Sequence, residues 1–172
     1  MSTEDGQIDP GKAILASDPQ RPDGRQSARA LEIGRGVARL LKQHGFATMP
    51  EMPLANNRRA DIVALGDSGE IWIVEIKSSL EDFRSDNKWP EYAEFCDRFL
   101  FAVLPDFPLD VLPEDVGLIV ADRYGGEIVR PAEEDKLAAA RRKAMTQRFA
   151  RIAARRLQAL TDPDAALDGS RS

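Results

Sequence analysis

Two apolar segments joined by a short polar turn most constrain how this 172-residue chain can fold. Residues 59–65 and 70–77 read as β-strands, and together they predict a β-hairpin. Both strands carry charge where strands are normally apolar: Asp61 lies in the first, and Glu75 and Lys77 lie in the second. Burying charge in a sheet is costly unless the charges are paired or bind something, so these residues need an explanation.

The segments around the hairpin predict one central sheet with helices packed against it. A helix is expected over residues 27–44, capped by Ser27 and stopped by Gly45. Its apolar face is expected to hold Leu31, Gly34, Ala38 and Leu41. The other expected elements are a strand at 46–49, a turn at 67–69, a short helix near 88–98 with Pro90 in its first turn, strands at 99–104, 116–121 and 127–131, and a long helix from Glu133 or Glu134 to Leu160.

This order, α-β-β-β-α-β followed by a hairpin and a helix, predicts a mixed α/β (α+β) domain. We expect a core domain at residues 27–132 and a basic helix at 133–160 that packs on the core or extends from it. Residues 1–26 and 161–172 are rich in Asp, Gly and Pro or lack apolar periodicity, and are expected to be flexible tails.

Composition narrows the class of protein. The chain is 42% hydrophobic and 31% charged, as in soluble globular proteins, and no apolar run approaches the roughly 20 residues of a membrane span. The amino-terminal residues lack the basic start and apolar stretch of a signal peptide, and the single cysteine, Cys96, cannot form an internal disulfide. We therefore expect a cytoplasmic protein without a membrane partner.

The charge distribution is more informative than the net charge of −5. Between Lys136 and Leu160 there are eight Lys or Arg residues and no Asp or Glu. A basic stripe of Arg141, Arg148, Arg151 and Arg155 runs beside an apolar stripe of Met145, Phe149 and Ile152. This pattern favours contact with nucleic acid. An acidic protein partner and a merely solvated amphipathic helix remain alternatives.

The charged residues of the hairpin suit metal chemistry. Glu75 and Lys77 lie on one face of their strand, and Asp61 on the neighbouring strand can converge with Glu75. Two carboxylates and a backbone carbonyl such as that of Ile76 are the hard oxygen ligands that Mg²⁺ or Mn²⁺ prefers, and the single histidine, His44, excludes a His-rich site. Such a set suits metal-assisted phosphodiester hydrolysis, with the lysine orienting a water or balancing phosphate charge.

The E-x-K tripeptide has little specificity, because Glu134 and Lys136 form a second copy at the start of the last expected helix. What distinguishes Glu75 and Lys77 is their place at the end of an apolar strand, across a hairpin from Asp61. The alternative is that Asp61, Glu75 and Lys77 form a structural ion pair at a sheet edge.

The D…E-x-K set within the α-β-β-β-α-β order resembles the PD-(D/E)XK, or restriction-endonuclease-like, nuclease superfamily over residues 27–105. More closely, the stretches "RRADIVAL", "GEIWIVEIKSS" and "DFRSDNKWPEYAEFCDRFLFAV" resemble the MmcB-like DNA-repair proteins of bacteria. The resemblance implies a nuclease-like fold and a part in repair of DNA damage. Ala60 replaces the proline of the superfamily motif, at a degenerate position. By position, the resemblance implies that Lys88 assists catalysis and that Glu32 is a further metal ligand.

Other residues near the hairpin have two readings each. Arg58 and Arg59 can grip a phosphate or be solvated loop charges. Ser78 and Ser79 can hydrogen-bond a phosphate or form a turn, and Glu32 can pair with Arg35 on its helix. Trp89 and Tyr92 are expected to pack against the sheet, although an exposed aromatic ring could stack on an unpaired base.

Three functions are therefore carried forward. The first is a DNA-repair deoxyribonuclease that uses Mg²⁺ or Mn²⁺, with Asp61 and Glu75 holding the metal, Lys77 positioning water and Lys88 assisting. The second is a nuclease-like module that binds damaged DNA, or recruits repair proteins, without cutting. The third is a sheet-based adaptor whose basic helix meets an acidic partner.

Overall fold

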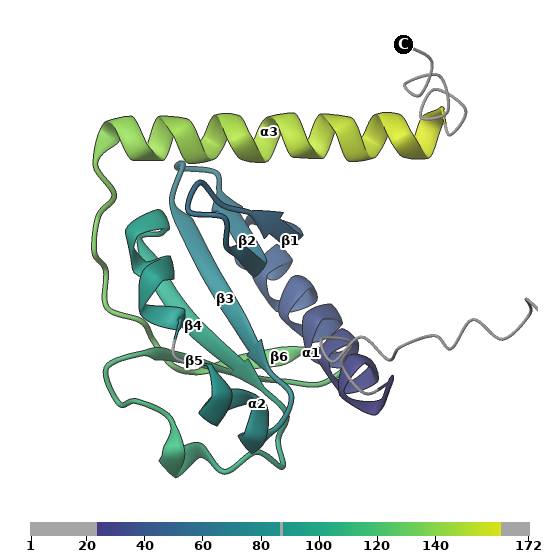
Figure 1. Cartoon of the computed structure of the whole chain (residues 1–172), viewed down its shortest axis with the longest axis vertical. Coiled ribbons are helices and arrows are strands. Elements are labelled where there is room, and N and C mark those ends of the chain that lie inside the picture. The colour runs from purple at the N-terminus through teal and green to yellow at the C-terminus, as the bar shows by residue number, and fades with distance from the viewer. Residues whose placement is uncertain (1–23, 87, 163–172) are drawn as a thin grey trace, which may run out of the picture.

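Figure 1 shows the computed structural model of the chain, which describes residues 24–86 and 88–162. Most of the expected tails, residues 1–23 and 163–172, lie outside the described residues. The elements in chain order are α1 (Gly24–Gln43), β1 (Phe46–Pro53), β2 (Arg59–Gly66), β3 (Ile71–Lys77), α2 (Leu80–Ser85), the 3₁₀ helix η1 (Trp89–Phe95), β4 (Arg98–Val103), the 3₁₀ helix η2 (Leu109–Val111), β5 (Gly117–Ala121), β6 (Gly126–Arg130) and α3 (Ala139–Thr161).

The six strands form one mixed sheet in the order β1-β2-β3-β4-β5-β6, so each strand pairs with its neighbours in the chain. The pairs β1–β2, β2–β3 and β5–β6 are antiparallel, whereas β3–β4 and β4–β5 are parallel. Segments between the parallel strands hold α2, η1 and η2, as parallel pairing requires crossover connections. The predicted mixed α/β fold with a carboxy-terminal helix is confirmed.

Side-chain alternation gives the sheet two apolar faces. On one face, α1 packs Ile33, Val37 and Leu41 against strand residues that include Val74 and Ile119. On the other face, η1 and α3 cover β2 and β3 with a second cluster that includes Tyr92, Phe95, Met145, Phe149 and Ile73. A third cluster, built around Phe101 and Phe107, continues this face towards η2. The sheet therefore separates two cores.

Helix α1 differs from the expectation in two respects. It begins at Gly24, so Ser27 lies inside the helix and is not its N-cap. The sheet-facing side is formed by Ile33, Val37, Leu40 and Leu41, whereas Leu31 is 60% exposed. Of the expected stripe of Leu31, Gly34, Ala38 and Leu41, only Leu41 is buried in the core, because the helix is rotated so that its larger aliphatic residues meet the sheet. Gly45 does stop the helix, with φ of 82°.

Strand β1 is longer than expected because it continues through two prolines to Pro53. Met52 is fully buried and pairs with Ala60 of β2, which keeps the strand on the sheet. A proline lacks the N–H that a ladder needs, but β1 lies at the sheet edge, where this is tolerated. The turn at 67–69 and Pro90 at the start of η1 are as predicted, and the remaining strand ends agree within one residue.

Helix α3 begins at Ala139, so the expected start at Glu133 or Glu134 is wrong and the first turn holds no acidic residue. The buried carboxylate of Asp97 explains this start. It accepts hydrogen bonds from the N–H of Leu137 and from the Arg142 guanidinium, at 2.9 Å and at 2.5–2.7 Å respectively. Its backbone carbonyl accepts from the N–H of Asp135, so residues 135–137 are held extended. Burial acts to raise the pKa of Asp97, but these hydrogen bonds hold the pKa below its usual range.

From this anchor, α3 runs across one end of the sheet (Figure 1). Met145 and Phe149 are buried beneath it, and Ile152 packs on the same cluster, as the apolar stripe predicts. None of the helices in the described part of the chain combines the length and the apolar character needed to span a membrane.

Candidate active site

The carboxylates of Asp61 and Glu75 meet where β2 and β3 separate. Regular pairing of the two strands ends at Ile62 and Val74, one step before these residues. The N–H of Asp61 donates to Glu75 Oε1 at 3.1 Å, and the N–H of Ile76 donates to Asp61 Oδ2 at 2.8 Å. Each carboxylate therefore replaces a backbone acceptor on the opposite strand, which fixes both side chains between the strands.

Each carboxylate keeps a second oxygen that accepts no hydrogen bond from the described residues. No fully buried side-chain oxygen in the described part of the chain lacks a partner, so these second oxygens reach solvent. Burial raises the pKa of Asp61 above its ordinary value. Burial, with the nearby charge of Asp61, raises the pKa of Glu75 to about 8. Such a pair favours a bound proton or a bound cation.

Backbone geometry adds a third oxygen on the same side. The N–H and C=O of one strand residue point to the same side of the strand, and the N–H of Ile76 points at Asp61. The carbonyl of Ile76 therefore faces the gap where the β2–β3 ladder has ended. Two carboxylates and one carbonyl fit Mg²⁺ or Mn²⁺, which bind hard oxygen ligands and keep several waters. Among the described residues, no group of three or more acidic, His or Cys side chains is placed to hold a metal, and a ligand role for Glu32 stays a prediction.

Lys77 lies beside the pair and is only 3% exposed. Its Nζ is 2.5 Å from Asp86 Oδ2 and 5.8 Å from the ring centre of Phe101. Partial burial acts to raise the pKa of Asp86, but the hydrogen bonds from Lys77 and from the N–H of Lys88 lower it below the usual range. The Lys77 charge also acts against the raised pKa of both Asp61 and Glu75. The ammonium group thus sits between three carboxylates.

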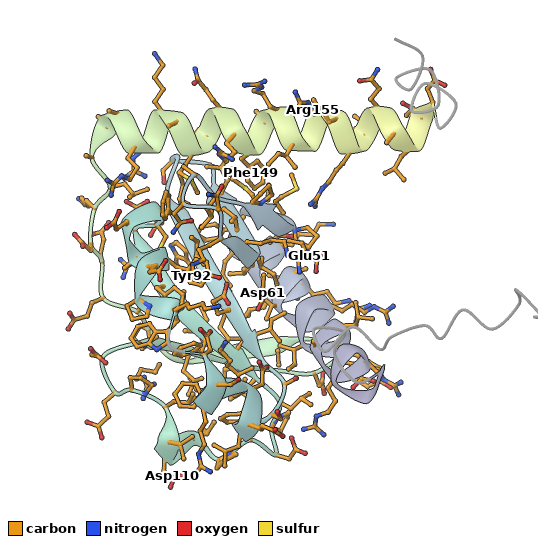
Figure 2. All side chains as sticks on the ribbon, in the orientation of Figure 1. Glu51, Asp61, Tyr92, Asp110, Phe149 and Arg155 are labelled. Carbon is orange, nitrogen blue, oxygen red and sulfur yellow. The ribbon has the colours of Figure 1, made fainter. Side chains whose placement is uncertain are left out.

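These residues form the floor of a cleft of about 960 Å³. Helix α1 supplies one wall, and α2 with η1 supplies the other. In Figure 2, Asp61 lies below α3. The lining of the cleft includes Leu31, Gly34 and Arg35 from α1, Arg59, Asp61, Glu75, Ile76 and Lys77 from the strands, Asp86, Lys88 and Tyr92 from the opposite wall, and Arg156 from α3.

The chain resembles known proteins in sequence and in structure. The family described as DNA repair protein MmcB-like matches residues 17–164 of the chain. The chain belongs to this family. A solved structure, the SPO1766 protein of unknown function from Silicibacter pomeroyi, is 51% identical and has a TM-score of 0.77, over 79% of this chain and 93% of that chain. No curated protein matches the chain.

In this MmcB-like chain the predicted strand residues are brought together, while their neighbours differ in role. Lys88 and Arg59 line the cleft, but Arg58 does not, because it forms a two-point ion pair with Glu91 at 2.7–2.8 Å. Ser79 caps α2 by accepting from the N–H of Asp82. Ser78 is buried and donates to the Asp82 carboxylate. Both serines therefore have structural partners, and phosphate contact by them stays a prediction.

The arginines of the basic stripe of α3 differ in whether they form hydrogen bonds with the described residues. Arg141 donates to the carbonyl of Glu94 at 2.9 Å, and Arg148 donates to the carbonyl of Pro53 at 3.3 Å. Arg151 and Arg155 are exposed and have no hydrogen bond or ion pair with the described residues. Figure 2 shows Arg155 on the outer side of α3, opposite the buried Phe149. The outer face of α3 therefore looks away from the cleft.

Three residues of the cleft make contacts that the sequence did not predict. Asp86, which holds Lys77, belongs to a polar stretch that carries no periodic signal. Arg156 belongs to the basic segment but turns under α3, where it donates to the carbonyls of Pro50 and Glu51. Tyr92 packs on Phe99, as expected, and its hydroxyl also donates to the carbonyl of Arg59 at 3.2 Å. Lys77 and Asp86 lie 9 residues apart in the sequence, Tyr92 and Arg59 lie 33 apart, and Arg156 lies 105 or 106 residues from its partners.

Proposed function

We propose that the chain hydrolyses phosphodiester bonds in DNA with the help of Mg²⁺ or Mn²⁺ and acts in DNA repair. The observation that supports this most is the meeting of the buried Glu75 carboxylate with the half-buried Asp61 carboxylate, each with one free oxygen, beside Lys77 at the floor of a cleft. Membership of the MmcB-like DNA repair family supports the role in repair. The observed order of α1, β1, β2, β3, α2, η1 and β4 supports placing the fold in the PD-(D/E)XK superfamily.

The position of each cleft residue gives its role in the proposed hydrolysis. Asp61, Glu75 and the carbonyl of Ile76 would hold the cation, which when bound lowers the pKa of an attacking water and polarises the phosphoryl oxygen. Lys77 keeps a positive charge within the cleft and is oriented by Asp86. That charge is placed to balance negative charge gained by the phosphate during attack. Lys88, on the opposite wall, adds a second cation at the cleft.

The test combines cleavage with a measurement that does not depend on turnover. Labelled duplex, nicked, flapped and single-stranded DNA is incubated with the protein in Mg²⁺, Mn²⁺ or EDTA. We expect metal-dependent cleavage that is lost in Asp61→Asn and Lys77→Met. Mn²⁺ should also raise the melting temperature of the wild type but not of Asp61→Asn, since only the wild type offers both carboxylates.

Glu114→Gln, an exposed glutamate outside the cleft, is the matched control and should behave as the wild type. Cleavage that survives Asp61→Asn, or the absence of cleavage on every substrate with no Mn²⁺ shift, would overturn the proposal.

A second candidate is a nuclease-fold module that binds damaged DNA or recruits repair proteins without cutting. The free Arg151 and Arg155 favour it, because their face points away from the cleft and serves no step of hydrolysis. Three results together would support it. Asp61→Asn should still bind DNA or a partner, an Arg151→Gln/Arg155→Gln variant should lose that binding, and the wild type should show no cleavage. Binding of an acidic protein but of no DNA at low salt would support the adaptor.

A further inference from the structure

We infer that the cleft takes a single nucleic-acid strand, whose phosphates are held by Arg35 on α1 and by Lys88, the residue before η1, on either side of Asp61 and Glu75. The inference rests on the proposed function, and it names the class of substrate and two residues that position it. Arg35 and Lys88 stand on opposite walls of the cleft that the carboxylates floor.

Arg35 and Lys88 differ from the neighbouring cations, which have ion-pair partners. Arg29 pairs with Asp106 at 2.7 Å, and Arg58 pairs with Glu91, so both are already neutralised. The side chains of Arg35 and Lys88 are exposed and make no hydrogen bond or ion pair with any residue in the described ranges. Their charges are therefore available to an anion that enters between the walls.

Charge is arranged in two levels. The floor carries the carboxylates of Asp61 and Glu75 and the ammonium group of Lys77, and the openings carry Arg35 and Lys88, whereas Arg59 is paired with Glu51 at 3.5 Å. The unpaired cations of the openings attract a polyanion, so one reacting phosphate can be lowered towards Lys77 on the floor while the phosphates beside it stay at the openings. This arrangement suits a chain of phosphates better than a single free phosphate.

The depth of the floor selects a single strand. Glu75 is 4% exposed and Lys77 is 3% exposed, so a reacting phosphate must pass between α1 on one side and α2 with η1 on the other. The major groove of duplex DNA, about 12 Å wide, admits one helix, whereas here elements stand on both sides of the phosphate. A single strand can pass between the two walls, because neither wall then has to fit into a groove of the nucleic acid.

An exposed apolar residue on the wall also favours a single strand. Leu31 lines the cleft one helical turn from Arg35 and is 60% exposed. Unpaired bases can pack against protein side chains while their phosphates are bound, whereas duplex bases are stacked inside the helix. Leu31 therefore offers a base contact beside the phosphate contact of Arg35, and only a single strand can use both.

The experiment measures binding in EDTA, where the proposed cleavage cannot contribute. A labelled 12-nucleotide single strand and the matching duplex are titrated by fluorescence anisotropy over a series of salt concentrations. The wild type should bind the single strand more tightly than the duplex. Arg35→Gln and Lys88→Gln should each weaken single-strand binding about fivefold at 0.1 M salt and reduce the salt slope of log K by about 0.7.

Two further variants complete the design. Leu31→Ser should reduce the preference for the single strand while leaving the salt slope unchanged. Lys42→Gln removes an exposed cation from α1 outside this cleft and should change neither quantity. The inference is overturned if the duplex binds as tightly as the single strand, or if Arg35→Gln or Lys88→Gln behaves as Lys42→Gln.

Failure here is distinguishable from failure of the proposed function. Strand-selective binding without cleavage in any metal counts against the nuclease proposal alone. Metal-dependent cleavage that is equal on single strand and duplex, and insensitive to Arg35→Gln, counts against the strand inference alone.

Discussion

At the residue scale, Asp61 and Glu75 serve the sheet and the cleft at once. One oxygen of each carboxylate accepts a backbone N–H of the opposite strand, and the other reaches the cleft. The backbone bonds fix the side chains, so the free oxygens are positioned before any ligand binds. The energetic cost is that two acids are buried close together, and this cost appears as raised pKa values.

Glu75 should make stability fall with rising pH. Its pKa is about 8 in the folded chain and about 4.3 when unfolded. Between these values the folded state holds more protons, so the free energy of unfolding decreases as pH rises. Glu75→Gln cannot ionise and should exceed the wild type in stability at pH 8.5 by up to a few kcal/mol, at about 1.4 kcal/mol per pKa unit.

Urea denaturation in EDTA between pH 5 and 8.5 measures this effect. The difference between Glu75→Gln and the wild type should grow with pH, while Glu114→Gln should run parallel to the wild type. A constant difference across this range would contradict the prediction.

Lys77 and Asp86 should be energetically coupled, because their ion pair of 2.5 Å is almost fully buried on the lysine side. Removing one partner of a buried pair leaves the other uncompensated and costs about 3–5 kcal/mol. We expect Lys77→Met near the lower end, since Asp86 is partly exposed. A double-mutant cycle with Asp86→Asn should give a coupling energy above about 1 kcal/mol. Additive effects would show that the pair does not orient Lys77.

At the element scale, two glycines of α1 lie in different surroundings. Gly36 faces the β5–β6 turn so closely that a Cβ would collide with the backbone oxygens of Asp122 and Gly125. A Cβ on Gly34 would meet only Ile76 Cδ1, at an ordinary 3.5 Å. The first contact involves backbone, which cannot move aside as a side chain can, so Gly36 fixes the distance between α1 and the far end of the sheet.

Alanine at these two positions should therefore have opposite effects on thermal stability. Gly36→Ala should destabilise by about 1–3 kcal/mol or more through overpacking. Gly34→Ala should be neutral or stabilising by up to about 1 kcal/mol, because alanine favours the helix. Thermal denaturation followed by circular dichroism compares them, and equal melting temperatures would contradict the close approach of α1.

At the scale of the whole molecule, one sheet carries two apolar cores, and each holds one of the two tryptophans. Trp72 packs with Phe46 beneath α1, at a ring distance of 4.6 Å. Trp89 stacks on Phe99 on the opposite face, at 5.6 Å. Because the same strands line both cores, neither core can lose its packing without disturbing the other.

Unfolding should therefore be a single transition at both tryptophans. The variants Trp72→Phe and Trp89→Phe each leave one fluorescent reporter, and each reporter should give the same urea midpoint as circular dichroism measured on the same variant. Midpoints that differ between reporter and backbone signal within one variant would show that the two faces unfold separately.

The features that could be predicted were those that depend on residues close together in the sequence. Two apolar runs around a polar turn predicted β2, β3 and the meeting of Asp61 with Glu75, and the apolar stripe of Met145 and Phe149 predicted the inner face of α3. The start of α3 was not predictable, because it depends on Asp97, some forty residues away in the chain. The pairing of Arg58 with Glu91 and of Lys77 with Asp86 likewise depends on tertiary contacts that leave no periodic signal.

The agreement between strand order and chain order has a consequence for biosynthesis. Each new strand adds to the exposed edge of those already made, from β1 to β6, and none must insert between two paired strands. The sheet can therefore grow as the chain leaves the ribosome, with Asp61 and Glu75 joined once β3 has emerged. Helix α3 follows all six strands in the chain, so it closes the second core only after the sheet is complete.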